Sequence, residues 1–97
     1  MNRVVVRYRV KPEQAERNEE LVRAVYEELR SADPAGFRYT TFRLEDGISF
    51  VHIAETEGDE SPLPKLAAFR EFQKDIVDRC DEPPVVSKAA QVGAFRF

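Results

Sequence analysis

The sequence of 97 residues predicts one α+β domain of the ferredoxin-like kind, a four-stranded antiparallel sheet with two helices on one face. Four strand-like runs are separated by segments whose apolar residues recur at helical spacing, in the order strand, helix, strand, strand, helix, strand. Prolines, glycines and acidic residues lie between these segments. Both crossovers in this order are expected to be right-handed, which places both helices on the same face of the sheet.

The chain opens with a predicted strand over residues 3–10 (RVVVRYRV). Alternation divides its side chains between two faces, with Val4, Val6, Tyr8 and Val10 on one and Arg3, Val5, Arg7 and Arg9 on the other. The segment Lys11-Pro12-Glu13 opens the first helix, because proline is favoured in the first helical turn. The apolar stripe of this helix runs from Leu21 to Leu29, and residues 31–36 (SADPAG) end it.

A hairpin follows, with strands at residues 37–44 (FRYTTFRL) and 48–55 (ISFVHIAE). The Asp-Gly pair between them is typical of a tight turn, because it tolerates positive φ angles. In the second of these strands the aliphatic Val51 and Ile53 are expected to pack beneath the helices. Phe50 and His52 are then expected to share the opposite face.

The second helix is predicted to begin at Ser61-Pro62, which is a cap followed by a proline, and to continue to Cys80. The segment 81–84 (DEPP) is predicted to break it, and residues 89–97 are predicted to form the last strand. In this topology the first and third strands are central.

Large apolar side chains on both faces of the predicted strands indicate a homodimer. Two helices cover only one face of the sheet, yet Val5 and Phe42 oppose other apolar residues across their strands. An uncovered face of this kind would exceed the apolar patch of a typical monomer. Two sheets packed face to face would bury it, and such pairing can leave a cavity between sheet and helices or between the sheets.

Composition excludes several classes of function. A net charge of −3 argues against general binding to nucleic acids or acidic membranes. The single cysteine and single histidine form no metal-binding motif, and no metal is expected. Arginines within the opening apolar run argue against a signal peptide, and no apolar stretch is long enough to span a membrane, so a cytoplasmic location is expected.

Three segments carry a family resemblance: the opening strand into Val10-Lys11-Pro12, the strand Phe50-Val51-His52-Ile53-Ala54-Glu55, and the following helix over 66–72 (LAAFREF). With these segments the sequence resembles the dimeric α/β-barrel superfamily, specifically proteins like the antibiotic-biosynthesis monooxygenases. The resemblance implies oxygenation of quinol-like or anthrone-like aromatics without a cofactor. Haem-degrading relatives use a tryptophan, an asparagine and a helix histidine. This sequence has no tryptophan and its lone histidine falls on a strand, so no haem degradation is expected.

Five side chains are candidates for a site. His52 is the only side chain whose ordinary pKa lies near neutrality, and it is predicted to accept a proton from a phenol or enol. Arg7 and Arg9 are predicted to hold the resulting anion. Tyr39 can donate a hydrogen bond to a carbonyl, and Phe50 can stack on an aromatic ring. For each, a structural role in the core or in an interface is the alternative.

Three functions remain open from the sequence. The chain is a cofactor-independent monooxygenase of small aromatic or polyketide-like compounds, a non-catalytic barrel that binds an apolar ligand, or a structural dimer with a filled core. No dinucleotide-binding glycine pattern occurs, and no cofactor is expected. A cavity with a polar end and a volume of roughly 300 Å³ or more would favour the first two.

Overall fold

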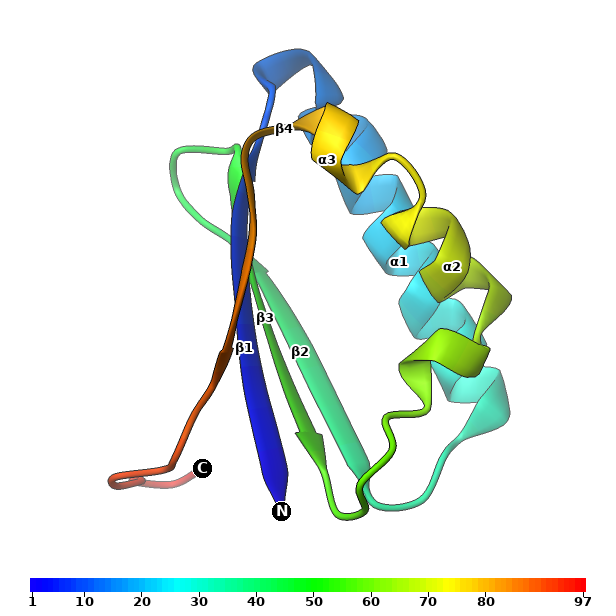
Figure 1. Cartoon of the computed structure of the whole chain (residues 1–97), viewed down its shortest axis with the longest axis vertical. Helices are drawn as coiled ribbons and strands as arrows, with labels where there is room; N and C mark the ends of the chain where they lie inside the picture. The colour runs from blue at the N-terminus through cyan, green and yellow to red at the C-terminus, as the bar shows by residue number, and fades with distance from the viewer.

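The computed structural model describes residues 1–97 and confirms the predicted α+β class and element order. Its single sheet is antiparallel, in the order β2-β3-β1-β4. Strands β1 (Asn2–Val10) and β3 (Ser49–Thr56) are central, and β2 (Phe37–Arg43) and β4 (Cys80–Lys88) form the edges. All helices lie on one side of this sheet, and the other face is left open (Figure 1).

The first helical segment agrees with the prediction, and the second does not. A short 3₁₀ turn, η1 (Pro12–Gln14), precedes α1 (Ala15–Ala32). The predicted continuous second helix is instead divided into η2 (Leu63–Lys65), α2 (Ala67–Gln73) and α3 (Ile76–Arg79). Extended backbone at Leu66 separates η2 from α2, and Asp75, with φ of 63°, separates α2 from α3.

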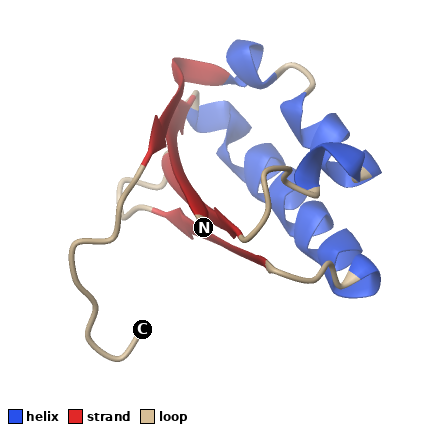
Figure 2. Cartoon of the chain, turned by 60° about the horizontal axis from the view of Figure 1, so that its bottom comes forward, coloured by secondary structure: helices blue, strands red, loops and turns tan.

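The prediction for the last strand is wrong. Strand β4 begins at Cys80, directly after α3, and pairs with β1, whereas residues 89–97 form no helix or strand. In Figure 2 this C-terminal segment runs away from the sheet as a loop. The two prolines at 83 and 84, which predicted a break, are tolerated because β4 is an edge strand and its register with β1 shifts beside Arg9.

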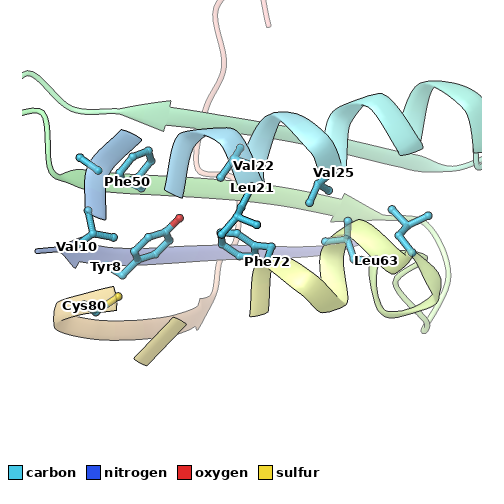
Figure 3. Close-up of a cluster of buried hydrophobic side chains, with 11 residues drawn as sticks. Tyr8, Val10, Leu21, Val22, Val25, Phe50, Leu63, Phe72 and Cys80 are labelled. Carbon is cyan, nitrogen blue, oxygen red and sulfur yellow. The ribbon is translucent and has the colours of Figure 1, made fainter. Parts of the chain in front are cut away.

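Strand register shows which side chains face the helices. Tyr8 pairs with Phe50, and Val6 pairs with His52. Phe50 is 1% exposed and His52 is 4% exposed, and both lie on the helix-covered face. The prediction that Phe50 and His52 share one face of the strand, opposite Val51 and Ile53, is therefore correct. The prediction that Val51 and Ile53 pack beneath the helices is wrong, because they belong to the open face. Figure 3 shows Tyr8 and Phe50 near Leu21 and Val22 of α1 and Phe72 of α2.

The open face of the sheet carries apolar side chains between ion pairs. Val5 lies opposite Ile53 on the neighbouring strand, and both are only partly exposed. Phe42 on β2 is 52% exposed and Val85 on β4 is 64% exposed. Glu55 accepts a hydrogen bond from the guanidinium of Arg3 at 3.1 Å. None of the helices has the length and apolar character needed to cross a membrane.

Candidate functional site

A cavity of about 330 Å³ lies between the helix-covered face of the sheet and the α2 region. Its wall is mainly apolar and comes from both layers: Val4, Val6, Ala54, Leu63, Phe69, Phe72, Ile76 and Val86. Polar side chains on its sheet side include Tyr8, Tyr39 and His52. An apolar chamber with a few convergent polar groups is the usual form of a small-molecule site. The volume of this cavity and its polar groups meet the criterion expected from the sequence for the two ligand-binding functions.

His52 lies at the centre of the polar part of the wall. Its Nε2 atom is 2.7 Å from the hydroxyl oxygen of Tyr8. Its Nδ1 atom is 2.7 Å from the hydroxyl oxygen of Tyr39 and 3.0 Å from Oγ1 of Thr41. The imidazole also packs in a tilted arrangement against Phe72 of α2, with the ring centroids 5.5 Å apart. Both ring nitrogens are thus hydrogen-bonded within the protein.

The hydrogen bonds continue from Tyr8 into the helical layer. The side-chain amide of Asn18 on α1 donates from Nδ2 to the Tyr8 oxygen at 2.9 Å. Oδ1 of Asn18 accepts from Nε of Arg79 at 3.3 Å. The two terminal nitrogens of Arg79 donate to the backbone carbonyls of Phe72 and Lys74, at 2.7 and 2.9 Å. A buried chain of four side chains therefore leads from α3 to the cavity wall.

Burial keeps the groups of the polar wall uncharged at neutral pH. It lowers the pKa of His52 from its ordinary value of 6.5 to about 4. Burial also raises the pKa of the hydroxyls of Tyr8 and Tyr39 well above their ordinary value of 10. The wall therefore meets a ligand with neutral hydrogen-bonding groups. No three His, Cys, Asp or Glu side chains are grouped in a way that could hold a metal ion.

The predicted site residues separate into two groups. Tyr39 and His52 are brought together in the cavity wall. Phe50 stacks on Tyr8 at 5.6 Å in the core and is not part of that wall. Arg7 and Arg9 extend from the open face, where Arg9 lies 3.4 Å from Glu82. Their predicted grouping with His52 is wrong. His52 pairs with Val6 on β1, and the adjacent Arg7 points to the opposite side of the sheet, as does Arg9.

Sequence reasoning did not assign Asn18 or Arg79 to the site. A signal for Asn18 was present, because it lies three, four and seven residues before the buried Leu21, Val22 and Val25. An apolar residue is expected at that position of an amphipathic helix. Arg79 gave no comparable signal, since its burial depends on the break at Asp75 and on carbonyl groups of α2.

Comparison with solved structures gives the same fold over nearly the whole chain. An antibiotic biosynthesis monooxygenase structure aligns with a TM-score of 0.76 at 23% identity, over 96% of this chain and 100% of that one. A candidate antibiotic biosynthesis monooxygenase from Nitrosomonas europaea aligns with a TM-score of 0.78 at 18% identity, over 96% and 100%. Rv0793 from Mycobacterium tuberculosis aligns with a TM-score of 0.74 at 17% identity, over 96% of both chains.

The amino-acid sequence itself matches no family model and no curated protein. At these identities the structural similarity establishes the fold, which is the one that the antibiotic biosynthesis monooxygenase structures share. A common fold hosts different activities, so the function has to be argued from the cavity and its polar wall.

Proposed function

We propose that this protein binds a small aromatic molecule in the cavity and oxygenates it with O₂ without a cofactor. The observation that carries the proposal is the cavity of about 330 Å³, whose wall is mainly apolar and includes the hydrogen-bonded side chains of His52 and Tyr39. Phe69 and Phe72 offer aromatic surface to a ring, while Tyr39 and His52 are positioned to act on an oxygen substituent. The names of the structural neighbours support the same class of chemistry.

The reaction proposed is the oxidation of an activated methylene group beside an aromatic ring. The substrate loses a proton to solvent water to give an enolate, whose electrons reduce O₂. One oxygen atom ends as the new carbonyl, and the other leaves as water with the two methylene hydrogens. The substrate supplies all the electrons, so no further reductant is required. A hydrogen bond to the enolate oxygen from Tyr39, whose own oxygen is hydrogen-bonded to His52, favours the first step because it stabilises the developing charge.

A cavity-filling substitution tests whether this chamber holds the ligand. Ala54 lies on β3 in the apolar part of the wall. Ala54→Phe should lower the affinity for anthrone by about 100-fold or more, because the added ring takes the volume that the ligand needs. Fluorescence titration or calorimetry measures the affinity, and Val92→Phe in the exposed C-terminal segment is the control for an added ring outside both the cavity and the open face. Equal anthrone binding by both variants would show that the cavity is not the binding site for anthrone.

Binding without turnover is the second candidate function. The observation that favours it is that both His52 nitrogens already have protein partners, and a group with a pKa of about 4 is a weak base at pH 7. Oxygen consumption by the purified protein with anthrone separates the two functions. Saturable oxygen uptake above the uncatalysed rate supports the monooxygenase, and tight binding without uptake supports a ligand carrier.

We also propose that the open face pairs two copies of the chain into a homodimer. Val5→Asp should shift the protein towards monomer at micromolar concentration, because it places an unpaired charge among the apolar groups of that face. Sedimentation equilibrium measures the change. Val5→Thr, which keeps the side-chain shape, should remain largely dimeric. A wild-type protein that sediments as a monomer throughout the micromolar range would refute the pairing.

A further inference from the structure

Two buried polar side chains, Asn18 and Arg79, lie behind the polar wall without lining the cavity. Asn18 is fully buried within α1, where asparagine is a poor helix former. Arg79 is 7% exposed and has no carboxylate partner. Well-packed apolar residues often give more stability than buried polar groups. Such a conflict with local preference is expected where a residue serves a site.

The chemistry of Arg79 sets the direction of every hydrogen bond that follows. A guanidinium group only donates, so the Asn18 atom that faces it is the carbonyl oxygen. The amide nitrogen of Asn18 then faces Tyr8, and the Tyr8 oxygen accepts its hydrogen. The hydroxyl hydrogen of Tyr8 is left to donate to the other neighbour of that oxygen, which is Nε2 of His52 at 2.7 Å.

The same argument continues through His52 to Tyr39. A neutral imidazole carries one hydrogen, and an accepting Nε2 places it on Nδ1. Nδ1–H is within reach of the Tyr39 oxygen at 2.7 Å and of the Thr41 hydroxyl oxygen at 3.0 Å. Tyr39 accepts at its oxygen, and its own hydroxyl hydrogen can point either to Thr41, which also lies close to that oxygen, or into the cavity. Tyr39 lines the cavity, so this hydrogen is available to a bound molecule.

We propose that Arg79 and Asn18 fix the direction of this chain, so that Tyr39 presents a hydrogen-bond donor to the cavity and selects ligands by an acceptor oxygen. Both are positioning residues, since they act through Tyr8 and His52. The inference rests on the proposed function for the identity of the cavity as the ligand site. It adds the chemical class of the ligand, which is an aromatic ketone, a quinone, or the enolate or phenolate form of such a molecule.

The series of hydrogen bonds also begins at a cation, the Arg79 guanidinium. This positive end suits a ligand oxygen that carries negative charge. Each hydrogen bond polarises the next one, and the effect is larger where water is excluded. In this arrangement His52 donates towards the ligand side and does not act as the proton acceptor that the sequence predicts. The polar wall stabilises the ligand anion by hydrogen bonding, and His52 does not have to act as the base that forms it.

The tautomer of His52 gives a direct test in the free protein. Because His52 is the only histidine, one imidazole appears in a long-range ¹H–¹⁵N correlation spectrum. At pH 7 the expected spectrum has a protonated Nδ1 and an unprotonated Nε2. A protonated Nε2, or two tautomers in comparable amounts, would overturn the proposal without any substitution being made.

Asn18→Asp should reverse the donor and acceptor roles in the hydrogen bonds from Tyr8 to Tyr39, with little change in side-chain shape. The new carboxylate accepts from Arg79 and also from the Tyr8 hydroxyl. The Tyr8 oxygen must then accept from Nε2–H of His52, so Nδ1 becomes the acceptor for the Tyr39 hydroxyl. The expected spectrum shows the opposite tautomer. An unchanged tautomer in a folded variant would show that Asn18 does not set the direction.

Arg79→Lys is the matched control for the first link of the chain. An ammonium group, like a guanidinium, only donates, so Asn18 keeps its orientation and the wild-type tautomer is expected. Arg79→Gln, whose amide oxygen can accept from Asn18, is expected to give a mixture of tautomers. A purely structural role for Arg79 would change stability in both variants and leave the tautomer the same in each.

Two ligand probes of similar size extend the test to selectivity. The oxygen of 1-tetralone only accepts hydrogen bonds, whereas the hydroxyl of 1-naphthol also donates. Asn18→Asp should change the ratio of their dissociation constants by about tenfold in favour of 1-naphthol, the effect of one hydrogen bond gained or lost. An unchanged ratio beside an inverted tautomer would overturn the selectivity. If neither probe binds the wild-type protein, the proposed ligand site fails, and the spectra still decide the direction of the chain.

Discussion

Lowering the pH from 6.5 to 4 should remove about 3 kcal/mol from the free energy of unfolding through His52 alone. Burial lowers the pKa of this imidazole from its ordinary value of 6.5 to about 4 in the folded protein. The unfolded chain therefore binds a proton near pH 6.5, while the folded chain stays neutral until about pH 4. Protonation favours the unfolded state throughout that range. Each pKa unit between the two states is worth about 1.4 kcal/mol.

The groups that face His52 do not offset this effect. Tyr8 from β1 and Tyr39 from β2 are neutral throughout the range, since burial raises the pKa of each hydroxyl. Phe72 of α2 is apolar, and Arg79 behind Asn18 carries a positive charge, which does not favour an imidazolium. Neither helix nor sheet brings a carboxylate to the imidazole.

Urea unfolding at several pH values measures the loss, with His52→Gln as the matched variant. Glutamine keeps a hydrogen-bonding side chain but does not titrate. Glu19, Asp46 and Glu55 also have a lowered pKa, and their stabilising contribution is lost as the pH falls below their ordinary pKa values. They contribute equally to both proteins, so the difference in slope isolates His52. Parallel curves for the two proteins between pH 6.5 and 4.5 would refute the assignment.

Sequence periodicity predicts which residues share a face but not which face the helices cover. On β3 one face carries Phe50 and His52 and the other carries Val51 and Ile53, so both have the apolar character of a core. The choice is made by tertiary contacts. Phe72 packs on the imidazole from α2, and the register with β1 places Tyr8 beside it. Neither contact is encoded within the strand itself.

The second half of the chain shows a related limit. Pro83 and Pro84 read as a break, but a proline is excluded only where the backbone N–H is needed by a neighbouring strand. Whether β4 is an edge strand depends on the complete sheet order. Cys80 was expected at the end of the second helix, but that helix ends at Arg79 and Cys80 is the first residue of β4.

The candidate site could be predicted in part. Residue chemistry identifies His52 and Tyr39, because few side chains in this sequence can exchange or donate protons near an apolar surface. Their partners come from three other elements, and Arg79 is 61 positions from Asn18 along the chain. A hydrogen-bond chain of this kind has no periodicity, so only the folded arrangement brings it together.

Tyr39→Phe should lower oxygen uptake with anthrone by roughly 10²–10³-fold, the loss expected when one donor to a developing oxyanion is removed. Tyr39 is the better target than His52, because removing the imidazole would leave the buried Tyr8 hydroxyl without its acceptor. The phenylalanine ring retains the stacking on Tyr26, whose centroid is 5.3 Å away. Nδ1–H of His52 retains Thr41 as an acceptor at 3.0 Å, so the folded state should be largely preserved.

Tyr26→Phe is the matched control for this loss of activity. It removes a hydroxyl from the same aromatic stack, but Tyr26 does not line the cavity and its oxygen contacts only Thr41, at 2.7 Å. Both variants should unfold within about 1 kcal/mol of the wild type, the usual effect of one hydrogen bond. Turnover should fall only in Tyr39→Phe. Because a general packing defect would affect both variants alike, equal rates in the two would show that the Tyr39 hydroxyl does not meet the reacting oxygen.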